Sequence, residues 1–330
     1  MPSTATPRPT VARPLEITAF LDRAGWGAAT AQGFDGDFSP RRYARLTRDG
    51  GATAILMDAD ANQKTPAFVA VAAILRRCGV RVPDIYAADA EHGMVLMEDF
   101  GARNVGALIG AGADMTPFLR RGAEMLARLH ERFGKADAGG LPVMNTDYFV
   151  QQAEWFLDSY IPYARHRDAT DSERDDFRAA WRAVLEPLEK MATSLVLRDF
   201  MPGNLMELPD GALGVLDFQD AGVGCIAYDL ASLCEEVRHD GAFAHMPDIV
   251  DHYIDAGRGD VPRGDLMRAC TILSAQRHTR ILGNLARTSV TRGRADLLDF
   301  IPRVRRHLTH ILAQPYLLPV RRWMESASAL

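Results

Sequence analysis

The segment 195–220 constrains the fold of this chain more than any other. In it, two short apolar strands flank a polar loop, which Pro202-Gly203 keeps irregular. The chain then turns at Pro209-Asp210-Gly211, because proline pre-sets one turn dihedral and glycine supplies a positive φ. A hairpin of this kind brings three oxygen-bearing side chains to one edge. They are Asp199, Asn204 and Asp217.

Three oxygen donors at one edge suit a magnesium nucleotide. Mg²⁺ prefers oxygen ligands and usually takes one or two carboxylates together with substrate phosphates. Asp199 and Asn204 have the D-x-x-x-x-N spacing of a kinase catalytic loop, and Asp217 follows at the distance of a metal-binding aspartate. We predict that Asp199 accepts the proton of an attacking hydroxyl, while Asn204 and Asp217 hold the metal. Turn capping is the alternative for each residue taken singly.

The same residues carry a family resemblance. The segments LRDFMPGNLM and VLDFQDAGVGCIAYDLASL are similar to the signature of the aminoglycoside phosphotransferase and choline kinase family, small-molecule relatives of the protein kinases. Within it the chain resembles the bacterial N-acetylmuramate/N-acetylglucosamine anomeric kinases, through AFLDRAGWG, SPRRYARL, ILMDAD, LDFQDA and SAQRHTRILGNLAR. The resemblance implies an α+β, two-lobed protein-kinase-like fold, with a small antiparallel-sheet N-terminal lobe and a larger, mainly helical C-terminal lobe.

We expect three parts along the chain. Residues 1–13 lack an apolar core and should form a disordered tail. Residues 14–100 should form the nucleotide-binding lobe, in which strands 43–47 and 53–57 flank a glycine turn. Residues 101–330 should form the catalytic and acceptor-binding helical lobe.

The resemblance also implies a nucleotide site in the N-terminal lobe. A loop there would cover the phosphates, and the segment after the last strand would bind adenine through backbone groups. The candidates are Ser39, Arg41, Arg42, Met97, Glu98 and Phe100. A solvated strand edge is the alternative for the two arginines, and a plain linker for the last three residues.

One position departs from the wider family. Met57 stands where a kinase usually carries a phosphate-pairing lysine, and the next helix contains no glutamate. One charge-assisted hydrogen bond contributes about 1.5–3 kcal/mol, so a substitute cation is expected from Arg41, Arg42 or Lys64. A nucleotide-binding pseudokinase is therefore an alternative function.

The acceptor site implied by the resemblance lies between the catalytic loop and a late helix, 265–287. Asp220, Gln276 and Arg277 are its candidate residues, with a solvated basic helix face as the alternative for Arg277 and Arg280. We expect an amino sugar, phosphorylated at its anomeric hydroxyl, with ATP and Mg²⁺ as cofactors. Aminoglycosides and other small alcohols are the alternative acceptors.

Two further residues bear on the catalytic loop. By resemblance, Asp229 is a structural acid that braces the active-site loops, with a simple helix N-terminal charge as the alternative. Leu197 stands where relatives often carry histidine. An apolar residue there implies that packing, rather than an imidazole, supports the loop.

Composition adds limits on partners and location. The net charge of −5 gives no basic footprint for nucleic acid. No apolar run approaches the ~18 residues that span a bilayer. The 4 cysteines lie far apart and read as reduced thiols. We expect a cytoplasmic monomer or weak dimer that binds neither nucleic acid nor membrane.

Overall fold

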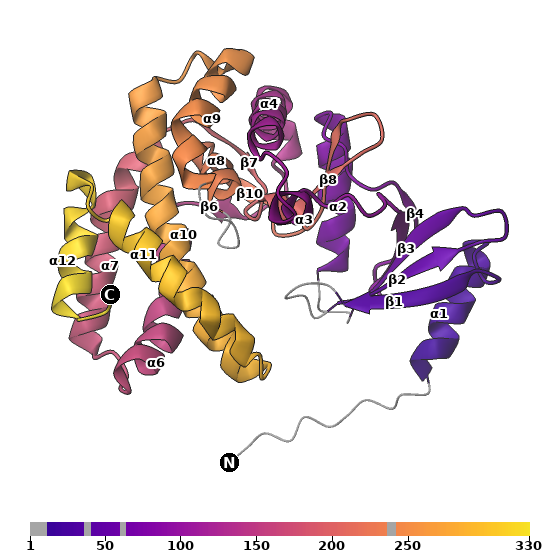
Figure 1. Cartoon of the computed structure of the whole chain (residues 1–330), viewed down its shortest axis with the longest axis horizontal. Helices are drawn as coiled ribbons and strands as arrows, with labels where there is room; N and C mark the ends of the chain where they lie inside the picture. Colours follow the sequence, from indigo (N-terminus) through magenta and orange to yellow (C-terminus); the bar gives the residue numbers. More distant parts are fainter. Residues whose placement is uncertain (1–11, 36–40, 60–63, 236–241) are drawn as a thin grey trace. The chain divides into compact units, whose positions relative to one another are not determined.

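The computed structural model describes residues 12–35, 41–59, 64–235 and 242–330 (Figure 1). By contacts the chain divides into two compact units. Unit 1 comprises Met1–Arg76 and Arg81–Ala102, and unit 2 comprises Arg77–Val80 and Arg103–Leu330. Unit 1 is built on an antiparallel sheet and unit 2 is mainly helical, so the predicted α+β class is confirmed.

The sheet of unit 1 has the order β1-β2-β3-β5-β4, and every neighbouring pair is antiparallel. Its strands are β1 (Thr30–Asp35), β2 (Arg42–Thr47), β3 (Thr53–Asp58), β4 (Ile85–Asp89) and β5 (Met94–Glu98). The helix α2 (Thr65–Arg77) connects β3 to β4. Sequence analysis did not predict β1, because Gly33 weakens the local strand pattern. In the structure β1 pairs with β2 along its whole length.

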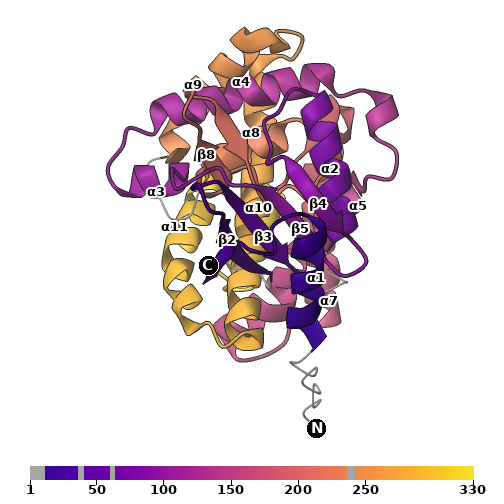
Figure 2. The ribbon, with the colours of Figure 1, turned by 90° about the vertical axis from the view of Figure 1, so that its right-hand side faces the viewer.

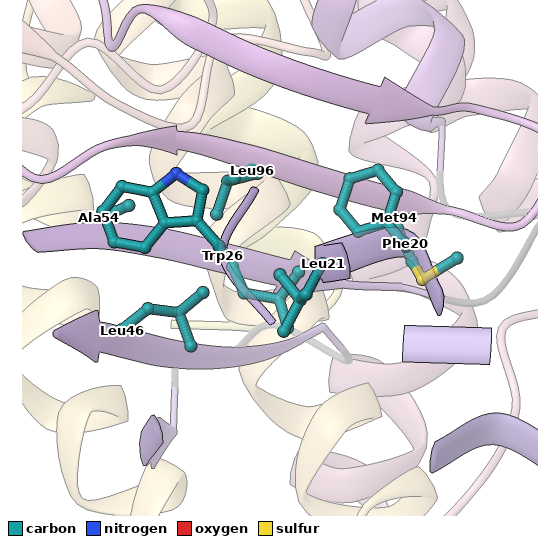
Figure 3. Packing of buried hydrophobic residues seen from close by; sticks show 8 residues of the cluster. Phe20, Leu21, Trp26, Leu46, Ala54, Met94 and Leu96 are labelled. Carbon is teal, nitrogen blue, oxygen red and sulfur yellow. The ribbon is translucent and has the colours of Figure 1, made fainter. Parts of the chain in front are cut away.

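One face of this sheet packs against the helix α1 (Ala12–Arg23). The buried cluster alternates along the strands, as the two-residue period of a strand requires. Its members are Phe20, Leu21, Trp26, Leu46, Ala54, Leu56, Met94 and Leu96, most of which are labelled in Figure 3. Burial of each large apolar side chain contributes about 1.5–3 kcal/mol. Because α1 begins at Ala12, it takes up the end of the segment predicted as a tail; residues 1–11 lie outside the described residues.

Unit 2 is organised around α10 (Arg263–Thr291), a helix of 29 residues. Its other helices are α3 (Val105–Gly110), α4 (Thr116–Arg132), α5 (Thr146–Ala153), α6 (Ile161–Arg165), α7 (Asp171–Leu185), α8 (Ala227–Cys234), α9 (Met246–Tyr253), α11 (Ile301–Ile311) and α12 (Leu318–Ser326). The helices α10 and α11 lie side by side, and α10 also packs against α8, α5 and α9 (Figures 1 and 2). Most of α10 between 269 and 286 is therefore buried, and the alternative of a solvated basic face for Arg277 and Arg280 is wrong.

Two small sheets complete unit 2. β6 (Val143–Met144), β10 (Gly222–Cys225) and β7 (Thr193–Val196) form one, in that order, and β8 (Leu205–Glu207) pairs with β9 (Leu213–Val215) in the other. All 4 cysteines are buried and unpaired, as the spacing predicted. Within the ranges described, none of the helices combines the length and the apolar content that crossing a bilayer requires.

Candidate active site

The hairpin predicted behind the polar loop is present. After β7, a 3₁₀ turn over Pro202–Asn204 leads into β8, which pairs with β9. Gly211 closes the intervening turn with a φ of 80° and donates its N–H to the Leu208 carbonyl at 2.9 Å. The chain leaves β9 directly into the segment that carries Asp217.

Hydrogen bonds tie the two ends of this loop together at Asn204. Its side-chain Nδ2 donates to the backbone carbonyl of Asp199 at 2.8 Å. Its own backbone carbonyl accepts the N–H of Leu216 at 2.9 Å, one residue before Asp217. The segments carrying the three predicted residues are thus held next to one another. Because Nδ2 is used inside the loop, the amide oxygen is the atom of Asn204 suited to a metal.

Two residues of the site have left-handed backbones although neither is glycine. Arg198 has a φ of 75° and Asp217 a φ of 58°. Non-glycine residues rarely adopt such conformations, and those that do cluster at functional sites. Asp217 is exposed, and its Oδ1 accepts a hydrogen bond from Gln219 Nε2 at 2.8 Å. The strained backbone therefore presents this carboxylate at the surface of unit 2.

A buried carboxylate from α8 supports the loop from behind. Asp229 accepts the N–H of Leu197 at 2.6 Å and the N–H of Arg198 at 2.9 Å, one on each oxygen. Burial raises the pKa of Asp229 to about 7, although these two hydrogen bonds act to lower it. The bracing role expected of Asp229 is confirmed, and the buried Leu197 packs where relatives often carry an imidazole.

Two arginines from α10 reach the proposed base. Arg280 Nη2 lies 3.4 Å from Asp199 Oδ1, and Arg277 Nη1 lies 3.9 Å from the same oxygen. Arg277 also donates to the Arg198 backbone carbonyl at 2.9 Å and stacks on the Tyr228 ring. Both arginines are buried. Sequence reasoning missed the role of Arg280; its position one turn after Arg277 was the available signal.

These arginines change the electrostatics of Asp199. Burial by itself raises the pKa of the Asp199 carboxyl. Nearby guanidinium groups outweigh burial and hold that pKa below its ordinary value. In order of their effect, they belong to Arg280, Arg198 and Arg277. Asp199 therefore stays ionised at neutral pH, as a proton acceptor must.

The predicted acceptor residues fall in different surroundings. Gln276 is fully buried, and its Nε2 donates to the Phe149 carbonyl at 2.9 Å, so its amide joins α10 to α5. Asp220 is half-buried, with Oδ2 3.5 Å from Arg198 Nη1. Arg277 lies beside the base. The placement of Gln276 favours packing, whereas Asp220 and Arg277 lie among the residues around Asp199.

The predicted phosphate-binding residues belong to unit 1. Ser39 lies outside the described residues, and Arg41 is buried at the start of the segment before β2. Arg42 pairs with Asp58, its direct partner in the β2–β3 register, through contacts of 2.8 and 2.9 Å. Met57 is fully buried. The Arg42–Asp58 ion pair thus lies next to Met57, the position where other kinases carry the lysine, because Asp58 directly follows Met57 in β3.

The predicted adenine-binding segment follows β5. Met97 is buried and pairs with β3, and Glu98 is ion-paired with Arg81. Phe100 has the Arg81 guanidinium 5.0 Å from its ring centroid. One arginine therefore fixes both Glu98 and Phe100 and orders this segment.

Comparison with known sequences assigns the family. A model described as "Phosphotransferase enzyme family" matches residues 30–266. The chain is 28% identical to an N-acetylmuramate/N-acetylglucosamine kinase of Caulobacter vibrioides, over 93% of this chain and 94% of that protein. It is 31% identical to a kinase of the same name from Pseudomonas aeruginosa, over 88% and 87%. The chain belongs to the phosphotransferase enzyme family, as its motifs predicted, and is a phosphotransferase with an alcohol group as acceptor.

Solved structures confirm the two-lobed kinase-like fold. A choline/ethanolamine kinase family protein from Mesorhizobium loti has a TM-score of 0.65 at 14% identity, covering 94% of this chain and 99% of that one. An ADP-bound aminoglycoside phosphotransferase, APH(2'')-Ib, has a TM-score of 0.63 at 14% identity, covering 90% and 98%. At these identities the likeness concerns the fold. The family assignment favours an enzyme over the pseudokinase alternative.

Proposed function

We propose that this protein transfers the γ-phosphoryl group of Mg-ATP to the anomeric hydroxyl of an amino sugar of the N-acetylmuramate or N-acetylglucosamine type. The observation that carries the proposal is the braced loop, on which Asp199, Asn204 and Asp217 are held by hydrogen bonds to one another's segments. Relatives named for these two sugars match 84–93% of the chain at 28–31% identity.

The residues divide the work as phosphoryl transfer requires. Positioning and charge neutralisation supply most of the rate in such reactions. Asp199 accepts the proton of the acceptor hydroxyl, a role that contributes about 10²–10⁴ in rate. Asn204 and Asp217 offer the amide and carboxylate oxygens that fit Mg²⁺. Bound Mg²⁺ would neutralise charge on the nucleotide phosphates.

Unit 1 supplies the proposed nucleotide contacts. Arg42 is the strongest candidate for the missing cation, because Asp58 orients it much as a helix glutamate orients the usual lysine. Arg41 is the second candidate, and the backbone of 97–100 is proposed to bind adenine. A bidentate guanidinium suits phosphate oxygens at least as well as an ammonium does.

The charges near Asp199 bear on which acceptor is used. Two buried guanidinium groups lie within 4 Å of its carboxylate. These groups would repel a positively charged acceptor at short range. A polycationic aminoglycoside therefore fits poorly, whereas a neutral or anionic sugar fits well.

The proposal is tested by product analysis. The enzyme is incubated with ATP and Mg²⁺ and, separately, N-acetylglucosamine, N-acetylmuramate, an aminoglycoside and choline, and products are read by mass spectrometry. We expect a monophosphate from the two amino sugars only. The matched control is the 1,5-anhydro form of each sugar, which lacks the anomeric hydroxyl and should give no product. Phosphorylation of the anhydro sugar would exclude the anomeric position, and no product from either sugar would refute the acceptor class.

A further inference from the structure

The Asp199 carboxylate is held at its Oδ1 atom. Both α10 arginines approach Oδ1, Arg280 at 3.4 Å and Arg277 at 3.9 Å. Asn204 contacts the backbone carbonyl of Asp199 rather than its carboxylate. Among the described residues, both side-chain contacts of Asp199 fall on Oδ1, so Oδ2 is the oxygen left for a substrate hydroxyl.

Holding this carboxylate is costly for the fold. Arg277 is 2% exposed and Arg280 6% exposed. The Nε atoms of both are buried without a hydrogen-bond partner. Burying a guanidinium costs several kcal/mol unless it is paired, and apolar residues of similar volume are often as stable or more so. Packing therefore explains poorly why one helix buries two arginines whose hydrogen bonds are incomplete. Buried charges that cost stability in this way concentrate at functional sites.

Among the described residues, Asp199 is the carboxylate that forms ion pairs with both arginines. Asp229 is already used by the two backbone N–H groups of the loop. Asp220 lies against Arg198 at 3.5 Å. The phenols of Tyr148 and Tyr228 also lie close enough to Arg280 to act on its charge. The carboxylate that pairs with Arg280 is therefore that of Asp199.

We propose that Arg280, assisted by Arg277, is a positioning residue for the acceptor hydroxyl. By holding Oδ1, it fixes the rotation of the Asp199 carboxylate so that Oδ2 meets the hydroxyl proton as the oxygen attacks phosphorus. This inference rests on the proposed function. The family match ends at residue 266, so both arginines lie beyond it.

The test compares kinetic constants of three variants. Arg280→Met should lower kcat by about 10²-fold, because small misplacements of a reacting group have effects of this size. The KM for ATP and for the sugar should stay within about twofold, and Arg280→Lys should recover part of the loss, since an ammonium can still reach Oδ1. The matched control is Arg287→Met: Arg287 is exposed on the same helix, stacks on Trp155 at 4.9 Å, and should leave kcat unchanged.

A double-mutant cycle identifies the group through which Arg280 acts. In an Asp199→Asn background, Arg280→Met should cost less than about twofold further, because residues that act as a unit are strongly non-additive. A full additional loss in that background would overturn the proposal. So would a raised sugar KM with unchanged kcat, which would make Arg280 an acceptor contact.

Two results must be kept apart. Thermal melting checks that Arg280→Met folds. If it does not fold, Arg280→Lys takes its place in the double-mutant cycle, and the loss of kcat that this variant causes must disappear in the Asp199→Asn background. An active wild type with an unaffected Arg280→Met rejects the positioning role alone. A wild type that phosphorylates neither amino sugar rejects the proposed function instead.

Discussion

The two units hold their functional charges in different ways. In unit 2, Asp229 is fully buried and grips backbone N–H groups, while buried guanidiniums reach Asp199. In unit 1, the Arg42 side chain is 63% exposed, although the Asp58 side chain that it pairs with is only 8% exposed. Exposed pairs contribute about 0–1 kcal/mol, whereas a buried group left without a partner costs about 1–3 kcal/mol. We infer that substituting the buried charges around Asp199 affects catalysis and folding together, whereas substituting the exposed Arg42 mainly weakens nucleotide binding.

The largest effect is expected at the base. Asp199→Asn should lower kcat by about 10²–10⁴-fold, because general-base catalysis contributes that much. ATP binding, measured by calorimetry, should stay nearly intact, since the nucleotide contacts lie elsewhere. Full activity in this variant would remove the proposed role of Asp199.

The next effect concerns the brace. Asp229→Asn should reduce the free energy of unfolding by about 1–3 kcal/mol, because an amide cannot accept from both Leu197 and Arg198. Urea denaturation measures this. Asp248→Asn is the control: its pair with Arg120 is exposed and should contribute less than about 1 kcal/mol. Equal losses in the two variants would contradict the contrast between buried and exposed charges.

The same brace predicts a pH dependence. The pKa of Asp229 lies at about 7 in the folded protein and at an ordinary 3.8 when exposed. The folded state therefore binds the Asp229 proton more readily than the unfolded state does. The resulting contribution to the free energy of unfolding is fully present below about pH 4 and is lost as the pH rises through 7. Asp229→Asn should lack this part of the pH slope when unfolding is followed between pH 5 and 8. An unchanged slope would show that Asp229 does not titrate there.

A smaller effect is expected in unit 1. Arg42→Met should raise the KM for ATP about tenfold, the loss of roughly one charge-assisted hydrogen bond, with kcat nearly unchanged. Arg23→Met provides a control of similar exposure, since Arg23 is 65% exposed and lies 3.7 Å from Asp89. If Arg42→Met binds ATP normally, another cation replaces the lysine.

The smallest effect is expected at the position of the missing lysine. Met57 is fully buried, so Met57→Leu should cost less than about 1.5 kcal/mol, as volume-conserving core substitutions do. Steady-state kinetics should show kcat and the KM for ATP within about twofold of wild type. A selective loss of ATP binding would give Met57 a nucleotide role that packing does not provide.

Sequence reasoning predicted the catalytic hairpin because its turns are set by local chemistry. Pro202-Gly203 and Gly211 specify their conformations without help from the rest of the chain. The strand β1 was missed because Gly33 weakens a strand locally, and pairing with β2 overrides that preference. The burial of α10 was missed because arginines read as surface residues. The long-range contact with Asp199 accounts for Arg280 inside the protein, and no local pattern encodes such a contact.

Gly283 sets a limit on redesigning this enzyme. A methyl group at that position would overlap the backbone of Trp155 and Phe156, so the central helix and its neighbouring segment meet with no side chain between them. Exchanging α10 for the corresponding helix of another sugar kinase would therefore succeed only if the donor also carries glycine there. Libraries that vary this helix should leave the contact at Gly283 untouched.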